Sequence, residues 1–299
     1  MKLSVEDLNG LMRTAQAAAR EAGELILSKC GNPIQVESKD QGSTPASRVV
    51  TEVDRASQDL IVGRLREMMD RYPFGLLTEE SADDSSRLNA DYFWCVDPLD
   101  GTLSFVRGRA GYSVSIALVS REGKAVLGVI HDPVSGDIFQ ALEGRGAYKN
   151  GKRIEIRESP NEGPMYWLMD QSMKSLGDFS QLTGRLEEIA EKHGCSGLRI
   201  IDSAGAALNA AWVTQHASAL YFKLPKPEAG GGSYWDFAAS TCLLQEWGLP
   251  ATDIHGSPLN LNRSGTTFMN EHGVIYASRA ELGNAVRALY LEFDGNGSV

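Results

Sequence analysis

The residues best suited to chemistry lie in one short stretch, residues 97–102, which reads Asp-Pro-Leu-Asp-Gly-Thr. The apolar run at residues 92–96 comes directly before it, so the pattern predicts a buried strand that ends in a tight turn. Pro98 fixes its own φ and keeps the residue before it extended, while Gly101 can adopt backbone angles that are closed to other residues. Such a turn can hold its polar groups in a fixed arrangement.

The turn offers ligands for both a cation and an anion. The carboxylates of Asp97 and Asp100 and the carbonyl of Leu99 are oxygen ligands, which suit a hard cation and Mg²⁺ above all. The backbone N–H groups of Gly101 and Thr102 suit an anion if a short helix begins there. A metal ion and a phosphate group can thus meet at this turn. The alternative is a polar turn that only ends a strand, as most Asp-Pro and Asp-Gly pairs do.

Length and charge limit the classes of function. A chain of 299 residues can form one large domain or two of ordinary size, with a sizeable core. It has 29 Lys and Arg against 39 Asp and Glu, a formal net charge of -10 and no basic run, which disfavours a nucleic acid polymer as its partner. A small phosphorylated substrate is compatible with this charge, because divalent cations can neutralise the carboxylates locally.

Cysteine spacing and hydropathy indicate a cytoplasmic protein. The four cysteines are far apart and form no C-x-x-C pair, so we expect reduced thiols. The N-terminus lacks a signal-peptide pattern, and no apolar run reaches the ~18 residues that a membrane-spanning helix needs. We therefore expect neither secretion nor a membrane as partner.

Apolar periodicity and breakers predict an α/β chain in two layered halves, residues 1–155 and 156–299. In the first half we expect helices at 4–29 and 56–72, loops at 31–48 and 83–91, and strands at 74–78, 92–96, 112–120, 125–131, 137–142 and 146–148. In the second half we expect strands at 165–169, 198–202 and 219–224, a loop at 225–232, and helices at 180–193, 204–215 and 233–247.

Four acidic residues stand at the end of a predicted strand or the start of a predicted helix, beside an apolar run: Glu79, Asp97, Asp100 and Asp236. This placement predicts a common site. For Asp236 the alternative is an ordinary carboxylate in the first turn of a helix, where the helix dipole stabilises it by ~0.3–1 kcal/mol without a metal. The five histidines show no zinc-like spacing, and no Ser-His nucleophile motif is present.

Together these motifs resemble the inositol monophosphatase superfamily of Mg²⁺-dependent, lithium-sensitive phosphatases. Residues 97–102 match its D-P-[LI]-D-G-T signature, and residues 234–239 match its W-D-x-A signature. Residues 50–54 and 79–81 are similar to its first acidic segment and its Glu-Glu motif, and the order and spacing of all four segments fit. The resemblance implies a layered αβαβα sandwich and a homodimer.

The resemblance also implies a site with two Mg²⁺ ions. One ion would be held by Glu79, Asp97 and the Leu99 carbonyl. The second would be held by Asp97, Asp100 and Asp236, so that Asp97 bridges the two. Two metals suit the hydrolysis of a phosphate monoester, because they can stabilise both the entering and the leaving oxygen of a very slow reaction.

The implied nucleophile is a metal-activated water held by Glu79 and the Thr102 hydroxyl. Asp54 would accept a hydrogen bond from Thr102 or lie beside a third, weaker ion. The expected contacts to the phosphate and the rest of the substrate are Gly101, Thr102, Asp100 and Asp236.

The implied activity is hydrolysis of a small phosphate monoester, and two branches are open. One is inositol monophosphatase; the other is a 3′(2′),5′-bisphosphate nucleotidase acting on adenosine 3′,5′-bisphosphate. A glutamate that contacts inositol hydroxyls is expected where this chain has Lys223 and an enlarged loop at residues 225–232, which disfavours inositol. In the nucleotidase branch, Lys223 or Lys226 would face the second phosphate. Arg107 and Arg109 would either bind a second phosphate or lie solvated.

Two interpretations compete with this phosphatase. A haloacid-dehalogenase-like phosphatase places one residue between its two aspartates, whereas Pro98 and Leu99 both separate them here. A catalytically silent protein that binds a phosphorylated ligand or a partner would be indicated by the loss of a metal ligand. All four acidic residues and Thr102 are present, which favours the enzyme.

Overall fold

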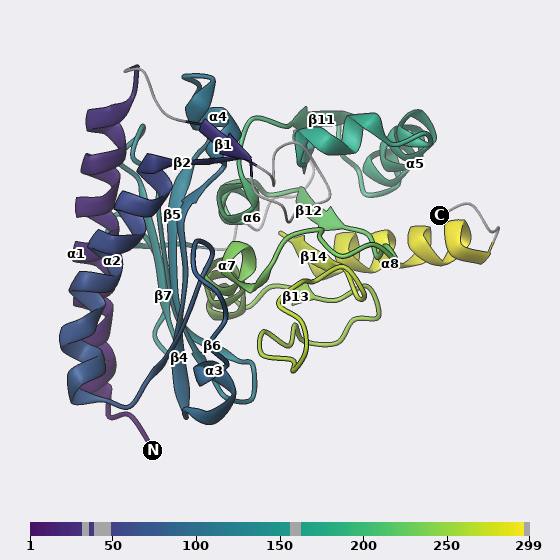
Figure 1. Cartoon of the computed structure of the whole chain (residues 1–299). Helices are drawn as coiled ribbons and strands as arrows, with labels where there is room; N and C mark the ends of the chain where they lie inside the picture. Colours follow the sequence, from purple (N-terminus) through teal and green to yellow (C-terminus); the bar gives the residue numbers. More distant parts are fainter. Residues whose placement is uncertain (32–35, 39–48, 156–162, 296–299) are drawn as a thin grey trace.

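The computed structural model describes residues 1–31, 36–38, 49–155 and 163–295. Two large β-sheets alternate with pairs of helices in five layers, αβαβα, which run from left to right in Figure 1. This arrangement is the layered α/β sandwich predicted from the sequence.

The first helical layer covers one face of the larger sheet. Its helices α1 (Val5–Lys29) and α2 (Glu52–Arg71) lie side by side. The sheet has the strand order β3-β4-β5-β6-β7-β8-β9 and is antiparallel except for the pair β3–β4. Its strands are β3 (Gly75–Thr78), β4 (Tyr92–Asp100), β5 (Ser113–Ser120), β6 (Ala125–His131), β7 (Ile138–Leu142), β8 (Gly146–Lys149) and β9 (Lys152–Arg153).

The middle helical layer, α6 (Ala206–Val213) and α7 (Tyr234–Trp247), lies between the two sheets and shares one core with both. Alternate residues of β4 serve the two faces of its sheet: Phe93 and Cys95 pack toward α6 and α7, and Trp94 packs toward α1 and α2. A sheet covered on both faces needs strands without a polar face, which is why β4 and β5 read as continuous apolar runs.

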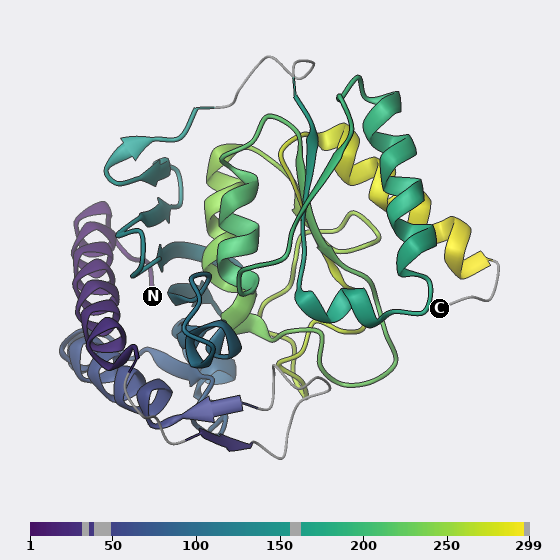
Figure 2. The same cartoon turned by 90° about the horizontal axis from the view of Figure 1, so that it is seen from above.

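The second sheet has the strand order β11-β10-β12-β14-β13. Its strands are β10 (Met165–Leu168), β11 (Leu198–Ile201), β12 (Ala219–Lys223), β13 (Ala251–Thr252) and β14 (Val274–Ala277). Strand β10 is parallel to both of its neighbours, and β14 is antiparallel to β12. Helices α5 (Phe179–Lys192) and α8 (Ala280–Gly295) form the outermost layer (Figure 2).

Shorter elements complete the described part of the chain: β1 (Val36–Ser38), β2 (Val49–Thr51), α3 (Ser86–Asn89), α4 (Thr102–Val106) and the 3₁₀ helix η2 (Gln171–Ser175). The seven-stranded sheet comes from residues 75–153 and the five-stranded sheet from residues 165–277. The division into halves at residue 155 stays a prediction. Among the described residues, no helix combines the length and the apolar composition needed to cross a membrane.

Most predicted elements are confirmed to within a few residues, but three predictions are wrong. Helix α2 begins at Glu52 and not at residue 56, because Thr51 and Asp54 form a capping box at its N-terminus. The predicted loop 83–91 contains α3, whose Arg87 is buried. Most of the predicted loop 31–48 lies outside the described residues, and residues 36–38 pair with β2 as a strand.

Candidate metal centre

A β-bulge turns the two aspartates of the central segment toward the same side. Residues three apart on a regular strand point to opposite faces of a sheet. In the register with β5, Asp97 pairs with Ser115 and Asp100 pairs with Ser113, so β4 has one more residue than β5 over this span. The extra residue re-aims the side chain that follows it. Both carboxylates can therefore face the middle layer of helices.

Gly101 ends the strand and starts α4. Its φ of 85° lies in the left-handed region, which favours glycine. A Cβ atom built there would lie 2.8 Å from the carbonyl oxygen of Gly111, so space also requires glycine at this position. Helix α4 begins at Thr102, which meets the condition under which the N–H groups of this turn would suit an anion.

The N-terminus of α6 holds the carboxylate of Asp100. The backbone N–H of Ala206 donates to Oδ1 at 3.0 Å, and that of Ala207 donates to Oδ2 at 2.9 Å. A Cβ atom on Gly205 would lie 2.4 Å from both oxygens, so the approach of α6 depends on this glycine. Oδ1 keeps a second lone pair for another ligand, whereas Oδ2 also accepts a hydrogen bond from the Ser113 hydroxyl at 3.3 Å.

Asp236 reaches the same place from α7. It lies in the first turn of that helix, and the backbone N–H of Ser233 donates to its Oδ2. Carboxylate oxygens of Asp97, Asp100 and Asp236 all lie within 4.8 Å of one another. Asp97 and Asp100 are almost fully buried, and Asp236 is half-buried. We call these three residues the acidic trio.

Glu79 lies beside the acidic trio and not within it. It follows β3, and because β3 and β4 are parallel neighbours, Glu79 and Asp97 come to the same edge of the sheet. The backbone N–H of Glu79 donates to the carbonyl of Val96 at 3.2 Å. Gln58 of α2 fixes the next residue, since its Oε1 accepts the backbone N–H of Glu80 at 3.0 Å.

Asp54 binds the hydroxyl group of Thr102. One oxygen of Asp54, Oδ2, accepts hydrogen bonds from both the backbone N–H and the hydroxyl of Thr51. The other, Oδ1, lies 2.9 Å from the Thr102 hydroxyl, which is also 3.0 Å from the Leu99 carbonyl oxygen. The contact between Asp54 and Thr102 is the one that the resemblance implies, while the contact of Thr102 with the Leu99 carbonyl and the capping of α2 by Asp54 were not predicted.

The buried carboxylates of this site repel one another, and too little positive charge lies nearby to balance them. Burial raises the pKa of Asp97 well above its ordinary value, and the nearby carboxylates of Glu79, Asp100 and Asp236 raise it further. Burial also raises the pKa of Asp100 to about 8 and that of Asp236 to about 6, although Lys223 acts in the opposite direction on Asp236. Burial raises the pKa of Asp54 as well. Buried carboxylates that repel one another are stabilised by a cation between them.

The ligand atoms fit a hard divalent cation. The acidic trio and the Leu99 carbonyl offer oxygen atoms alone, which is the chemistry that Mg²⁺ and Ca²⁺ prefer. The nearby ammonium group of Lys223 forms an ion pair with a different carboxylate, that of Asp170. It therefore neutralises the trio only in part.

Several residues that hold the site were not predicted as site residues. The N–H groups of Ala206 and Ala207 and the Ser113 hydroxyl all bind Asp100. The sequence gives little indication of this role, because these positions read only as a glycine followed by small residues at the start of a helix. The contact itself depends on which helix lies against β4, which periodicity does not show.

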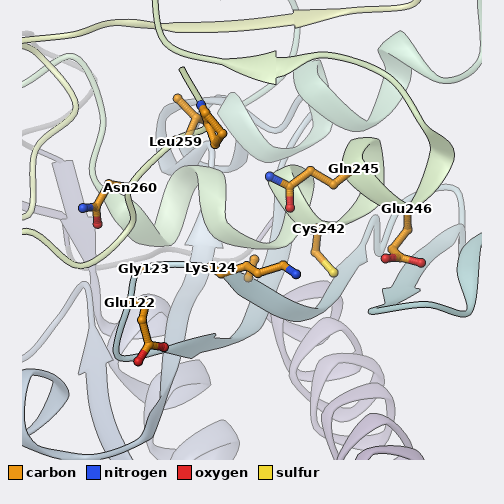
Figure 3. A pocket seen from close by; sticks show the side chains of 10 residues that line it. Glu122, Gly123, Lys124, Cys242, Gln245, Glu246, Leu259 and Asn260 are labelled. Atoms are coloured by element: carbon orange, nitrogen blue, oxygen red, sulfur yellow. The ribbon is translucent and has the colours of Figure 1, made fainter. Parts of the chain in front are cut away.

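A cavity in the described part of the structure lies away from this site. Its volume is about 510 Å³, and Figure 3 shows Cys242, Gln245 and Glu246 of α7 on one side and the turn with Glu122 and Lys124 on the other. None of the predicted site residues lines it. It lies along the C-terminal half of α7, whereas Asp236 lies at the N-terminal end.

Comparison with known proteins places the chain in a family. A family model described as the inositol monophosphatase family matches residues 7–290. The chain is 31% identical over 267 residues to the fructose-1,6-bisphosphatase/inositol-1-monophosphatase of Thermotoga maritima, which covers 89% of this chain and 93% of that protein. It is 34% identical over 257 residues to the Nus factor SuhB of Pseudomonas aeruginosa, which covers 83% of this chain and 86% of that protein.

Solved structures give the same result. The extragenic suppressor protein suhB of Bartonella henselae superposes with a TM-score of 0.71 at 26% identity, over 94% of this chain and 98% of that one. The IMPase of Thermotoga maritima superposes with a TM-score of 0.70 at 28% identity, over 92% of this chain and 96% of that one. The fold, the acidic trio and these matches agree: the chain belongs to the inositol monophosphatase family.

Proposed function

We propose that this protein is a Mg²⁺-dependent phosphatase that hydrolyses a small phosphate monoester. The observation that carries the proposal is the acidic trio, three carboxylates with oxygens within 4.8 Å of one another at the junction of β4, α6 and α7. The family supports phosphatase chemistry, and one relative is named as a phosphatase for fructose 1,6-bisphosphate and inositol 1-phosphate. Sensitivity to lithium, a homodimer and a cytoplasmic location accompany the proposal as expectations.

The resemblance to the family implies which residues would hold the metals, and the acidic trio supports it for one of the two ions. Asp97, Asp100 and Asp236 would hold one ion, and Glu79 with Asp97 and the Leu99 carbonyl would hold a second. When bound, such ions activate a water molecule and stabilise the charge on the oxygen that leaves phosphorus.

Asp54 and Thr102 would orient the attacking water. When Thr102 donates its hydroxyl proton to Asp54, the lone pairs of its oxygen are left to accept a hydrogen bond from the water. Glu79 would accept the proton that the water loses as its oxygen attacks phosphorus. The ester oxygen then leaves and takes a proton from solvent. The N–H groups of Gly101 and Thr102 would bind the phosphoryl oxygens.

The test is phosphate release with Mg²⁺ from inositol 1-phosphate, adenosine 3′,5′-bisphosphate, fructose 1,6-bisphosphate and histidinol phosphate. Asp97→Asn should abolish release, because it removes a charge from the position shared by both ions. Asp59→Asn is the matched control, since it makes the same change on the exposed face of α2 and should keep wild-type activity.

A catalytically silent protein is the alternative, and the relatives named as Nus factors give it a specific basis. If the wild-type protein releases no phosphate from any substrate while calorimetry still detects Mg²⁺ binding that Asp97→Asn removes, the metal site stands and the enzyme proposal fails. Release that persists in Asp97→Asn would contradict the two-metal assignment.

A further inference from the structure

The buried side chain of Arg87, on α3, joins two parts of the chain that each carry a predicted metal ligand. It is only 2% exposed, and its Nε atom donates to Asp83 Oδ2 at 2.8 Å. Its two terminal nitrogens donate, at 2.7–3.4 Å, to the Asn262 side chain and to the carbonyl groups of Arg263 and Thr266. Asn262 donates in return to the Arg87 carbonyl at 3.1 Å. One guanidinium group thus connects two segments that are far apart in the sequence.

The near end of this connection lies in the segment that follows Glu79. Asp83 comes four residues after Glu79. The residues between them are fixed by Gln58 of α2, whose Oε1 accepts the backbone N–H of Glu80 at 3.0 Å and whose Nε2 donates to the Ser81 hydroxyl at 2.9 Å. The ion pair at Asp83 is therefore anchored to the same short segment as the carboxylate of Glu79.

The far end lies in a loop, residues 262–269, which encloses the start of α7. Tyr234 is the first residue of α7 and stands two residues before Asp236. Its backbone N–H donates to the carbonyl of Thr267 at 3.0 Å, and its hydroxyl accepts the backbone N–H of Arg263 at 3.0 Å. The position of this loop therefore sets the position of the helix turn that carries Asp236.

The guanidinium group of Arg87 also lies over the ring of Tyr234, with Cζ 5.7 Å from the ring centre. Tyr234 is fully buried, so this cation–π contact is shielded from water. A buried ion pair adds little net stability to a fold, because taking the charges out of water offsets their attraction. What Arg87 contributes is therefore geometry. Its planar group presents N–H donors in fixed directions, which the single nitrogen of a lysine does not reproduce.

We propose that Arg87 is a positioning residue, which fixes the start of α7, and with it Asp236, relative to the segment that carries Glu79. The two carboxylates repel each other, since the charge of Glu79 adds to burial in raising the pKa of Asp236. A fixed link between their segments opposes that repulsion and keeps both carboxylates at one site. The inference rests on the proposed metal site and goes beyond it, because Arg87 acts through the residues that it holds.

The first test is the dissociation constant for Mg²⁺, measured by calorimetry with the full-length protein. Arg87→Met should weaken Mg²⁺ binding by about 10-fold or more, as is typical when groups that orient metal ligands are lost. The loss of a positive charge has the opposite effect, because it alone would strengthen the binding of a cation. Weaker binding therefore reports a change in geometry, and Mg²⁺ binding that is unchanged or tighter in Arg87→Met overturns the inference.

Other variants separate positioning from stability. Arg87→Lys keeps the charge and most of the volume, so it should fold, and it should still show most of the loss of Mg²⁺ affinity. Arg64→Met and Arg64→Lys make the same changes at an exposed arginine of α2 and should behave as the wild type. Leu186→Ala leaves a cavity beneath α5 and should lower Tm without weakening Mg²⁺ binding. An equal loss of affinity in Leu186→Ala would show that affinity only follows stability, and would overturn the inference.

Hydrogen exchange tests the inference without a metal. In EDTA, Arg87→Met should speed exchange at the backbone N–H groups of Tyr234 and Arg263 by roughly 10-fold or more, as for the loss of one charged hydrogen bond. The reference is the backbone N–H of Leu186, inside α5, whose exchange should change less. Unchanged exchange at Tyr234 and Arg263 overturns the inference even if the protein binds Mg²⁺. Faster exchange there supports it even if the wild type neither binds Mg²⁺ nor releases phosphate, an outcome that would refute only the proposed function.

Discussion

At the scale of single residues, Thr102 shows how one hydroxyl group can serve both folding and chemistry. It lies 2.9 Å from a buried oxygen of Asp54 and 3.0 Å from the Leu99 carbonyl. Thr102→Val keeps the shape of the side chain and removes the donor. We expect the free energy of unfolding to fall by about 1–3 kcal/mol, because a buried oxygen of Asp54 loses the hydrogen bond that Thr102 donates to it. We also expect kcat for phosphate release to fall about 10²-fold or more, because the attacking water loses a fixed acceptor.

Thr102→Ser is the matched control, since it restores the hydroxyl group and should recover most of both losses. Urea denaturation measures the stability, and steady-state kinetics with Mg²⁺ measures kcat. If Thr102→Val is destabilised but keeps the kcat of the wild type, the hydroxyl group serves the fold alone.

The sequence predicted the reactive residues better than it predicted what holds them. Asp97, Asp100 and Asp236 are chemically conspicuous, since each is a charged residue beside an apolar run. Their meeting depends on a bulge in β4 and on the packing of α6 and α7 against that strand. The pairing of Lys223 with Asp170 likewise depends on β10 and β12 being neighbours in the sheet. Residue spacing along the chain does not contain that information.

At the scale of elements, the N-terminus of α6 positions Asp100, a proposed metal ligand that comes from another part of the chain. We expect Gly205→Ala to displace the Asp100 carboxylate, because the new Cβ would lie 2.4 Å from its oxygens. Loss of groups that orient a metal ligand typically costs 10–100-fold in metal affinity or activity, so the Mg²⁺ concentration for half-maximal activity should rise by roughly 10-fold or more. Crowding should also lower the free energy of unfolding by about 1–3 kcal/mol.

Gly184→Ala is the control for that change. Gly184 lies inside α5, and a Cβ atom there would meet nothing within 4 Å. Alanine is the better helix former by roughly 1 kcal/mol, so this variant should be as stable as the wild type or more stable, with unchanged Mg²⁺ dependence. A Gly205→Ala variant with the Mg²⁺ dependence of the wild type would show that α6 does not position Asp100.

Helices and strands themselves were predictable where one pattern dominated. The apolar stripe of α1 and its Ser4–Asp7 capping box gave that helix its correct bounds. The same capping pattern, Thr51 with Asp54, marks the start of α2, but the helical periodicity from which we predicted this helix begins only at residue 56. In α3, the buried side chain of Arg87 donates hydrogen bonds to the segment at residues 262–266. An arginine in a polar stretch of sequence does not indicate that it will be buried.

At the scale of the whole molecule, we expect the stability of the fold to depend on pH and, through the proposed metal site, on Mg²⁺. Asp100 has a pKa of about 8 in the metal-free folded protein, raised from an ordinary value of 3.8 by burial and then by Asp236. The folded state therefore binds this proton more tightly than the unfolded state. The proton on Asp100 therefore adds to the free energy of unfolding. This contribution is at its full size below pH ~4 and disappears as the pH rises toward 8. Asp236, with a pKa of about 6, adds to the loss over a narrower range.

Mg²⁺ should reverse this loss, because a ligand that binds only the folded state stabilises it. We expect the difference in Tm between samples with Mg²⁺ and with EDTA to be small at pH 5, where protons occupy the carboxylates, and to grow steadily up to pH 8. Thermal unfolding across this range, with ionic strength matched by NaCl, measures the difference. Asp100→Asn should flatten its pH dependence, since it removes a group whose proton competes with the metal over this pH range. A difference that stays constant from pH 5 to pH 8 would mean that protons and Mg²⁺ do not compete for the acidic trio.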